Sequence, residues 1–270
     1  MKTINVYPLP SYAVNDDVTD FVAVVIDVLR ATTVVVSAFA SGAKDVIPML
    51  EIEQARQLKK ILEKKHGKGS VLLGGERKGI PIEGFDLGNS PQLVTPEKIA
   101  GKILILTTTN GTVAIHAAKK TQHLYVAGLV NAHAVVERLK NEKKIAIFCA
   151  GTDEHVTEED LLLAGCLVSR LSRYSQHNQY TCPCSHPNQN QPQYQWNNHA
   201  EKAKQLWENQ FFINNNEFVS EGLLVEFLRR SRGGKNLVEL SCDADIVAAA
   251  KIDSINLVPE IHLQNFPSTM

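Results

Sequence analysis

The chain has 270 residues and a formal net charge of −1, with 44% hydrophobic and 21% charged residues. This composition is ordinary for a soluble globular protein, and the near-zero charge gives no reason to expect a nucleic acid or an acidic membrane as partner. The N-terminus lacks the pattern of a secretory signal, and no segment approaches the roughly 18–20 apolar residues of a membrane helix. Five cysteines, an odd number, are most simply read as reduced thiols, so we expect a cytoplasmic protein.

Strand-like and helix-like segments alternate along the chain. Residues 21–26 form a β-branched and aromatic run that suits a strand buried on both faces. This rhythm predicts a layered α/β/α fold with a largely parallel or mixed sheet, built as one unit with two lobes at about residues 1–130 and 131–270. The other predicted strands are residues 3–6, 43–48, 71–73, 103–106, 124–126, 144–149 and 256–259; the predicted helices are residues 34–40, 51–65, 113–119, 132–140, 161–174, 201–210, 217–229, 236–240 and 243–251.

Residues 175–198 have a different composition, rich in Gln, Asn, Pro, His and Tyr and nearly free of aliphatic side chains. Such a segment cannot bury much apolar surface, so it is predicted to be a mobile insertion. Cys182 and Cys184, with His177 and His186, are weak candidates for a metal site, because a C-x-C spacing lacks the usual two-residue gap.

Polar residues follow the strand at residues 21–26 directly. Asp27 and Arg30 come first, and Thr32 and Thr33 follow them. Ligands of open α/β sheets bind beyond the carboxyl ends of the strands, where an Asp can hold a divalent cation and an Arg can hold a phosphate or carboxylate. The alternative is a buried Asp27–Arg30 ion pair that only fixes the turn.

A glycine-rich loop follows the strand at residues 71–73. It carries charges of both signs at Glu76, Arg77 and Asp86, and then Asn89 and Ser90. Loops of this length without secondary structure are usually functional, and glycine lets backbone N–H groups approach an oxyanion. The alternative is a surface loop whose charges are merely solvated.

A second hydroxyl-rich turn follows the strand at residues 103–106. Thr108, Asn110, Gly111 and Thr112 precede a predicted helix, whose free N–H groups and dipole favour an anion. Asn110 or Thr112 could instead be a simple helix cap, which is compatible with anion binding.

The strand at residues 144–149 ends at Cys149, which is followed by Gly151 and then by acidic residues that include Glu159 and Asp160. Acids in the first turn complement the helix dipole, but several adjacent carboxylates also suggest a metal ligand. Cys149 could be a phosphocysteine nucleophile. The chain lacks a C-x₅-R loop to stabilise that thiolate, so metal-activated water is preferred.

Common cofactor and hydrolase motifs are missing from the sequence: it has no Walker loop, G-x-S-x-G, H-E-x-x-H or G-x-G-x-x-G. The acids, bases and hydroxyls at the strand ends instead suit a small, highly anionic substrate held together with Mg²⁺.

Five motifs, in order along the chain, resemble the 2-phosphosulfolactate phosphatase family: VVIDVLRATT (24–33), GERKGIPIEGFDLGNSP (75–91), TTTNGT (107–112), CAGT…EED (149–160) and SRGGKNL (231–237). The resemblance implies an α/β fold of the type found in that family. It also implies Mg²⁺-dependent hydrolysis of 2-phospho-3-sulfolactate to 3-sulfolactate and phosphate, a step of coenzyme M biosynthesis. The alternative is a non-catalytic binding or regulatory protein for phosphorylated or sulfonated 2-hydroxy acids. The oligomeric state stays open, with a homodimer as one option.

Residue roles follow from chemistry. Arg30 and Arg77 are expected to clamp the phosphate or sulfonate, because a guanidinium matches the geometry of an oxyanion. The candidate metal ligands are Asp27, Glu76, Asp86, Glu159 and Asp160, and the candidate catalytic residues are Asp27, Arg30, Glu76, Arg77, Cys149 and Asp160. The candidate substrate-binding residues are Thr32, Thr33, Asn89, Ser90, Thr108, Asn110, Gly111, Thr112 and Gly151.

Overall fold

A computed structural model describes residues 2–177 and 194–262. Most of the predicted insertion, including Cys182, Cys184 and His186, lies outside the described residues. The two ends of that predicted segment belong to regular elements, α6 (Glu158–His177) on one side and β9 (Tyr194–Trp196) on the other. Among the helices that the structure describes, none is both long and apolar enough to cross a membrane.

The larger sheet has five parallel strands in the order β7-β2-β8-β1-β9. Its central strand β2 pairs with β7 on one side and β8 on the other, which explains why it is buried along its whole length. The strands of this sheet come from both sides of residue 130, and they are β1 (Lys2–Tyr7), β2 (Val22–Ile26), β7 (His123–Ala127), β8 (Lys144–Cys149) and β9.

The smaller sheet has the order β3-β6-β4-β5. Three of its strands are parallel, and the short β5 pairs antiparallel with β4 to form a hairpin. Its strands are β3 (Asp45–Pro48), β4 (Val71–Arg77), β5 (Ile80–Pro81) and β6 (Ile103–Thr107). The predicted α/β class with largely parallel strands is therefore confirmed, and in the part of the chain that the structure describes these strands form two main sheets.

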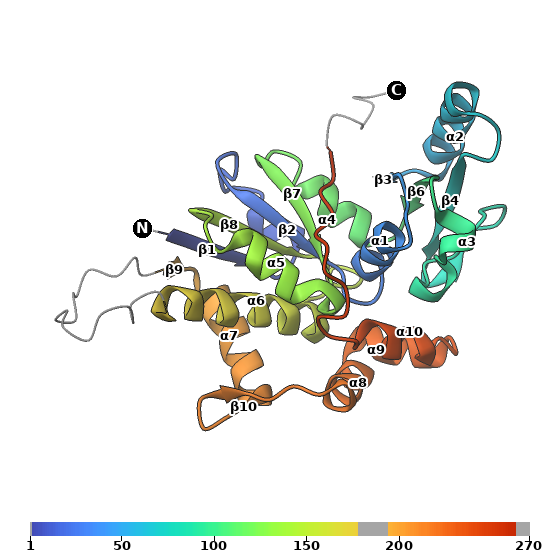
Figure 1. The fold of residues 1–270 in the computed structure, drawn as a ribbon. Helices are drawn as coiled ribbons and strands as arrows, with labels where there is room; N and C mark the ends of the chain where they lie inside the picture. The colour runs from blue at the N-terminus through green and yellow to red at the C-terminus, as the bar shows by residue number, and fades with distance from the viewer. Residues whose placement is uncertain (1, 178–193, 263–270) are drawn as a thin grey trace.

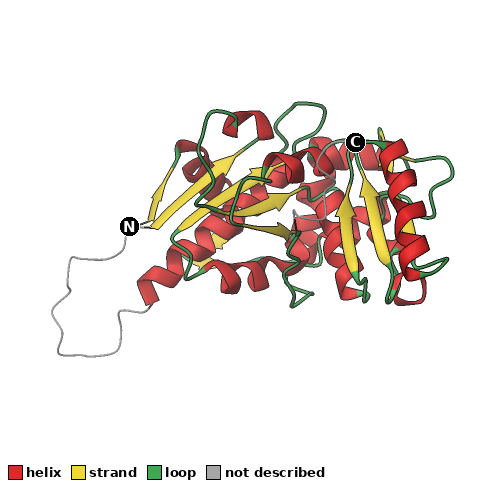
Figure 2. Cartoon of the chain, turned by 90° about the horizontal axis from the view of Figure 1, so that it is seen from above, coloured by secondary structure: helices red, strands yellow, loops and turns green. Residues whose placement is uncertain are grey.

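Helices pack on both faces of each sheet and form alternating layers (Figures 1 and 2). On β2, Val22, Val24 and Ile26 pack in one core with α5 (Ala132–Leu139), α6 and α7 (Asn198–Phe211). The alternate residues Ala23 and Val25 pack in a second core with α1 (Ala31–Ala40) and α4 (Gly111–Ala117). This alternation is the two-residue period of a strand.

The central helices α1 and α4 also cover the smaller sheet. Leu104 and Leu106 of β6 belong to the same core as these helices. Ile103 and Ile105, on the opposite face, pack with α2 (Ile52–His66). The two sheets consequently share one helical layer, and the carboxyl ends of β2, β4 and β6 can approach the same region.

The last part of the chain departs from the predicted elements. Residues 256–259 are not a strand, although Val126 donates a hydrogen bond to Pro259 O and Ile261 donates one to Leu124 O. The helix predicted at 217–229 begins later, as α8 (Glu221–Arg230), because β10 (Phe212–Ile213) and β11 (Asn216–Glu217) form a hairpin before it. The motif SRGGKNL (231–237) begins α9 (Arg232–Glu239), with Ser231 as its N-cap.

The helix α10 (Asp243–Ala249) packs against α8 and α9 and against the short turn η2 (Pro91–Leu93). Figure 1 shows α8, α9 and α10 grouped beside the two sheets. The remaining short elements are η1 (Pro10–Ala13), α3 (Pro96–Ile99) and η3 (Leu129–Asn131).

Candidate active site

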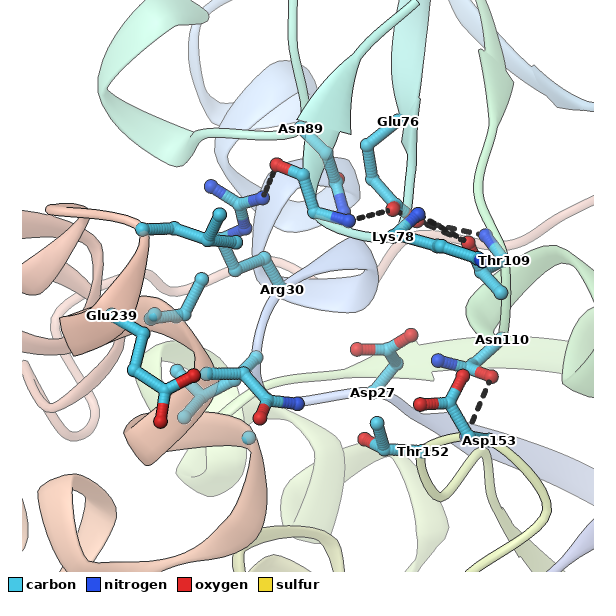
Figure 3. A pocket seen from close by; sticks show the side chains of 16 residues that line it. Asp27, Arg30, Glu76, Lys78, Asn89, Thr109, Asn110, Thr152, Asp153 and Glu239 are labelled. Carbon is cyan, nitrogen blue, oxygen red and sulfur yellow. Dashed lines mark hydrogen bonds between the residues drawn. The ribbon is translucent and has the colours of Figure 1, made fainter.

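A cavity of about 550 Å³ opens where the carboxyl ends of β2, β4 and β6 meet α9 (Figure 3). Five of the predicted site residues line it: Asp27, Arg30, Glu76, Asn89 and Asn110. The other lining residues are Leu29, Lys78, Gly79, Thr109, Thr152, Asp153, Gly233, Asn236, Leu237, Glu239 and Leu240.

Asp27 follows β2 and is 8% exposed. Its Oδ1 accepts a hydrogen bond from Ala31 N at 3.2 Å, at the start of α1. A Cβ on Gly111 would lie 2.7 Å from Asp27 Oδ2, so only glycine leaves that oxygen its space. The pKa of Asp27 is raised to about 7. Burial is the largest cause, and the charges of Glu76 and Glu159 contribute to the rise.

Glu76 stands at the end of β4 and connects three backbone segments. Its Oε1 accepts from Thr109 N at 2.8 Å, and its Oε2 accepts from Gly79 N at 2.6 Å and from the Thr109 hydroxyl at 3.2 Å. Figure 3 shows these bonds at the edge of the cavity. Both oxygens are therefore occupied, and the carboxylate holds the β4–β5 turn against the end of β6.

The sequence left open a buried ion pair between Asp27 and Arg30, but Arg30 has a different partner. Its Nη1 donates to Asp245 Oδ2 at 2.7 Å, and its Nη2 donates to Gly79 O at 3.1 Å. Both side chains of the Arg30–Asp245 pair are 6% exposed. A guanidinium has more N–H groups than these two bonds use, so Arg30 retains donors for a ligand in the cavity.

Glu159 and Asp160 lie behind the cavity wall and are each 2% exposed. The two oxygens of Asp160 accept from Val28 N at 2.9 Å and Gly151 N at 3.0 Å, and so connect the ends of β2 and β8. Burial raises the pKa of Asp160 well above its usual range, as does the charge of Asp27. We therefore assign Asp160 to holding the strand ends, not to direct metal ligation.

The Glu159 carboxylate has one occupied and one free oxygen. Its Oε1 accepts from Gly233 N at 3.1 Å, at the start of α9. Its Oε2 is buried and has no hydrogen-bond partner among the described residues. Burial is the main cause that raises the pKa of Glu159. An orphaned carboxylate oxygen near Asp27 requires a proton, a water or a cation as partner.

The predicted threonines support the backbone instead of lining the cavity. Thr32 bonds the N–H and the carbonyl of Asp27 through its hydroxyl. Thr33 donates to Val28 O. The Thr108 hydroxyl accepts from Thr112 N, and Thr112 donates back to Thr108 O. Their role is to shape the two turns that present Asp27 and Asn110, since the hydroxyls are satisfied by main-chain groups.

Ser90 and Gly151 also take supporting positions. Ser90 donates from its hydroxyl to Asp245 Oδ1 at 2.6 Å. Gly151 adopts φ +66° and donates its N–H to Asp160. Neither residue lines the cavity. We therefore assign both to the support of residues nearer to the cavity, and not to direct contact with the substrate.

Three other predicted residues stand away from the cavity, and two of them belong to the glycine-rich loop. Asp86 pairs with Lys59 at 2.7 Å and accepts from Leu73 N. Arg77 donates to two main-chain carbonyls, those of Glu76 and Leu50. Since both side chains already have local partners, we assign Asp86 and Arg77 to fixing the loop and not to metal or oxyanion binding.

The third of these residues, Cys149, is fully buried at the end of β8. Burial raises the pKa of its thiol well above the usual value, and the charges of Asp160 and Glu159 act in the same direction. Since a nucleophilic cysteine must be an accessible thiolate, this environment argues against covalent catalysis by Cys149 and agrees with the preference for water.

Lys78 and Asp153 line the cavity but were not among the candidate residues predicted from the sequence, whereas Asn89 was. Lys78 has φ 51° at the tip of the β4–β5 hairpin, and its amino group has no hydrogen bond or ion pair within the described part of the chain. Asn89 is 5% exposed, and its Oδ1 has no partner among those residues. Asp153 also has a positive φ and donates its N–H to Asn110. Unpaired polar groups that face a cavity are available to a ligand.

The side chains that line the cavity carry too many carboxyl groups to bind a polyanion without a counter-charge. The lining has four carboxyl groups, those of Asp27, Glu76, Asp153 and Glu239, but only two basic side chains. One of these, Arg30, is paired with Asp245. A ligand with several negative charges would be repelled unless a cation or protons offset this excess.

The described residues contain no group of three or more His, Cys, Asp or Glu side chains arranged to hold a metal ion. Mg²⁺ does not need such a group, because it is usually bound by one or two carboxylates together with waters and substrate phosphate. Asp27 lines the cavity, and its Oδ2 is an oxygen donor of the kind it prefers, whereas the orphaned Glu159 Oε2 lies outside the lining. The site therefore fits an Mg²⁺ ion that is completed by a ligand.

Comparisons with known proteins identify relatives along nearly the whole chain. The model of a family described as 2-phosphosulpholactate phosphatase matches residues 7–264. A protein of Symbiobacterium thermophilum named probable 2-phosphosulfolactate phosphatase is 34% identical over 239 residues, which cover 88% of this chain and 90% of the relative.

Two other relatives with the same printed name are more similar over a shorter part. The protein of Thermotoga maritima is 48% identical over 151 residues, or 56% of this chain. The protein of Caldicellulosiruptor saccharolyticus is 46% identical over 162 residues, or 57% of this chain. The matched parts span 63% and 64% of these two relatives.

Proposed function

Since this chain belongs to the 2-phosphosulfolactate phosphatase family, we propose that it is an Mg²⁺-dependent phosphatase that hydrolyses 2-phospho-3-sulfolactate to 3-sulfolactate and phosphate. The observation that carries this proposal is the cavity in which Asp27, Arg30 and Lys78 face one space at the strand ends. In the cell we place this reaction in the cytoplasm, as a step of coenzyme M biosynthesis, and we expect the chain to work as one unit with two lobes.

Arg30 and Lys78 bind the anionic groups of the substrate. Arg30 is buried and fixed by two hydrogen bonds, so it presents a defined guanidinium plane to one oxyanion. Lys78 sits on a hairpin tip without a side-chain partner among the described residues, so it can reach a second anionic group. A substrate that carries phosphate, carboxylate and sulfonate groups matches two cationic contacts and a cation better than a simple phosphate ester does.

Asp27 is the residue that we propose as the principal Mg²⁺ ligand, with the remaining positions filled by water and substrate oxygens. When bound, Mg²⁺ would offset the charge of the phosphate and activate water as a nucleophile. Glu76 holds Thr109 and the hairpin tip in place through both of its carboxylate oxygens. Asn89 and Asn110 line the cavity and offer amide groups to orient the substrate or the attacking water.

Phosphate release from 2-phospho-3-sulfolactate tests the proposal. The protein is first treated with EDTA and then assayed with and without added Mg²⁺. We expect turnover only with Mg²⁺, and less turnover with 2-phospholactate, which lacks the sulfonate. Full turnover after exhaustive EDTA treatment would contradict the metal requirement. Tight binding of the substrate without any release of phosphate would favour a binding or regulatory protein instead.

A further inference from the structure

A buried hydrogen-bond network connects Arg30 to three segments that are distant in the sequence. Asp245, in the first turn of α10, accepts from Arg30 Nη1 through Oδ2 at 2.7 Å and from Ser90 Oγ through Oδ1 at 2.6 Å. Arg30 Nη2 donates to Gly79 O at 3.1 Å. The guanidinium is thereby held by α10, by the β4–β5 hairpin and, through Asp245, by the loop that contains Ser90.

The network leaves Arg30 little freedom to rotate. Two of its nitrogen atoms have fixed partners, and the side chains of Arg30 and Asp245 are each 6% exposed. Asp245 is not among the residues that line the cavity, so it reaches the ligand space only through Arg30. Its two carboxylate oxygens have one side-chain donor each, so the carboxylate itself is also fixed.

We infer that Asp245 is a positioning residue for substrate binding: it sets the plane in which Arg30 presents its remaining N–H groups to the phosphate or sulfonate. This inference rests on the proposed function, because it requires Arg30 to contact the substrate. It also gives Ser90 a definite role, since Ser90 donates to the second oxygen of Asp245 and keeps that carboxylate from turning.

The carboxylate could act on the substrate in two opposite ways. As a negative charge next to a cationic contact, Asp245 weakens the attraction between Arg30 and an anion. As a geometric support, it improves binding, because misplacement of a contact group by about 1 Å can cost about 100-fold in rate. The substitution Asp245→Asn removes the charge and leaves one acceptor oxygen in place of two, so Arg30 and Ser90 can no longer both donate to this side chain. The loss of charge alone predicts a lower KM, and the loss of support predicts a higher one.

Asp245→Asn and Ser90→Ala are compared with the wild type for phosphate release from 2-phospho-3-sulfolactate in the presence of Mg²⁺. If Asp245 positions Arg30, Asp245→Asn raises KM and lowers kcat/KM by about 10- to 100-fold. Ser90→Ala, which leaves the Arg30–Asp245 pair in place, gives a smaller loss of about 3- to 10-fold in the same direction. The affinity for inorganic phosphate, measured by calorimetry, should fall in both variants.

A matched control is available on the same helix. Asp243 pairs with Arg229 at 2.7 Å, but this pair is exposed and lies outside the cavity lining. Asp243→Asn should leave KM, kcat and phosphate affinity unchanged. This result would show that the loss of any carboxylate from the first turn of α10 is not enough to weaken substrate binding. Circular dichroism of all variants checks that they are folded.

The possible outcomes separate the positioning role from the proposed function. If the wild type is active and the KM of Asp245→Asn is equal to or lower than that of the wild type, the positioning role is overturned. A Ser90→Ala variant with wild-type kinetics also overturns it, and this second variant keeps the test decisive even if Asp245→Asn does not fold. An inactive wild type overturns the proposed function itself.

Discussion

The substitution Asp27→Asn should stabilise the metal-free protein while it abolishes activity. Asp27 is buried, and its pKa is raised from 3.8 to about 7, with burial as the largest cause. Because the folded state holds the proton more tightly than the unfolded chain, wild-type stability falls as the pH rises from about 4 through 7. Asn remains neutral at every pH and can still accept the hydrogen bond from Ala31 N.

The expected gain can be worked from the pKa. One pKa unit corresponds to about 1.4 kcal/mol, so Asn should add about 4 kcal/mol to the free energy of unfolding at pH 8 and less than about 1 kcal/mol at pH 4. For a chain of this size, the gain at pH 8 corresponds to a rise in Tm of about 10 °C. The assay is thermal unfolding in EDTA, followed by circular dichroism at both pH values.

Asp243→Asn is the matched control, because the exposed Asp243 has a lowered pKa owing to its hydrogen bond with Arg229. Its substitution should give no gain that grows with pH. An Asp27→Asn protein that is less stable than the wild type at pH 8, or equally stabilised at pH 4 and pH 8, would refute the reasoning. Added Mg²⁺ should stabilise the wild type and not the Asp27→Asn variant.

Three further sets of substitutions separate contact residues from supporting ones. Arg30→Lys should lower kcat/KM roughly 30- to 1000-fold, whereas Arg77→Lys should change it by less than about threefold, because of these two arginines only Arg30 lines the cavity. Equal effects of the two substitutions in steady-state kinetics would contradict this placement. Cys149→Ala should retain kcat and lose about 1–2 kcal/mol of unfolding free energy in urea, since the thiol is buried in the core. A folded variant without activity would instead support covalent catalysis by Cys149. Lys78→Gln should raise KM about fivefold, because it removes an unpaired charge from the cavity, and this increase should shrink at high salt; an unaltered KM would remove Lys78 from the substrate contacts.

The sequence predicts well those site residues that follow directly from a buried strand. Asp27 is an example, because the apolar run of β2 and the polar turn after it place the side chain at the sheet edge. Glu76 and Asn110 follow the apolar parts of β4 and β6 in the same way. The carboxyl ends of these strands meet because both sheets share α1 and α4, a packing relation that the order of elements does not specify.

Side-chain direction is the main property that could not be predicted from the sequence. Thr32 and Thr108 have the composition of an anion site, yet their hydroxyls bond the backbone of their own turns. Asp160 and Glu159 are adjacent, but only Glu159 keeps a free carboxylate oxygen. Local motifs cannot tell a capping hydroxyl or a bracing carboxylate from one that faces a ligand.

The partner of Arg30 could not be predicted for a different reason. Asp245 is 215 residues away in the chain, and it reaches Arg30 only because α10 packs on α8, α9 and η2. The nearby Asp27 was the natural candidate from the sequence. A contact of such separation depends on the tertiary fold and has no local signal.

A crystal structure with Mg²⁺ and 3-sulfolactate tests the central claim most directly. The proposed mechanism predicts a cation about 2.1 Å from an Asp27 oxygen, with further ligands from product and water. It also predicts one anionic group of the product on the guanidinium of Arg30 and another near Lys78. A product bound outside the cavity, or a cation held elsewhere while Asp27 stays free of it, would contradict the mechanism.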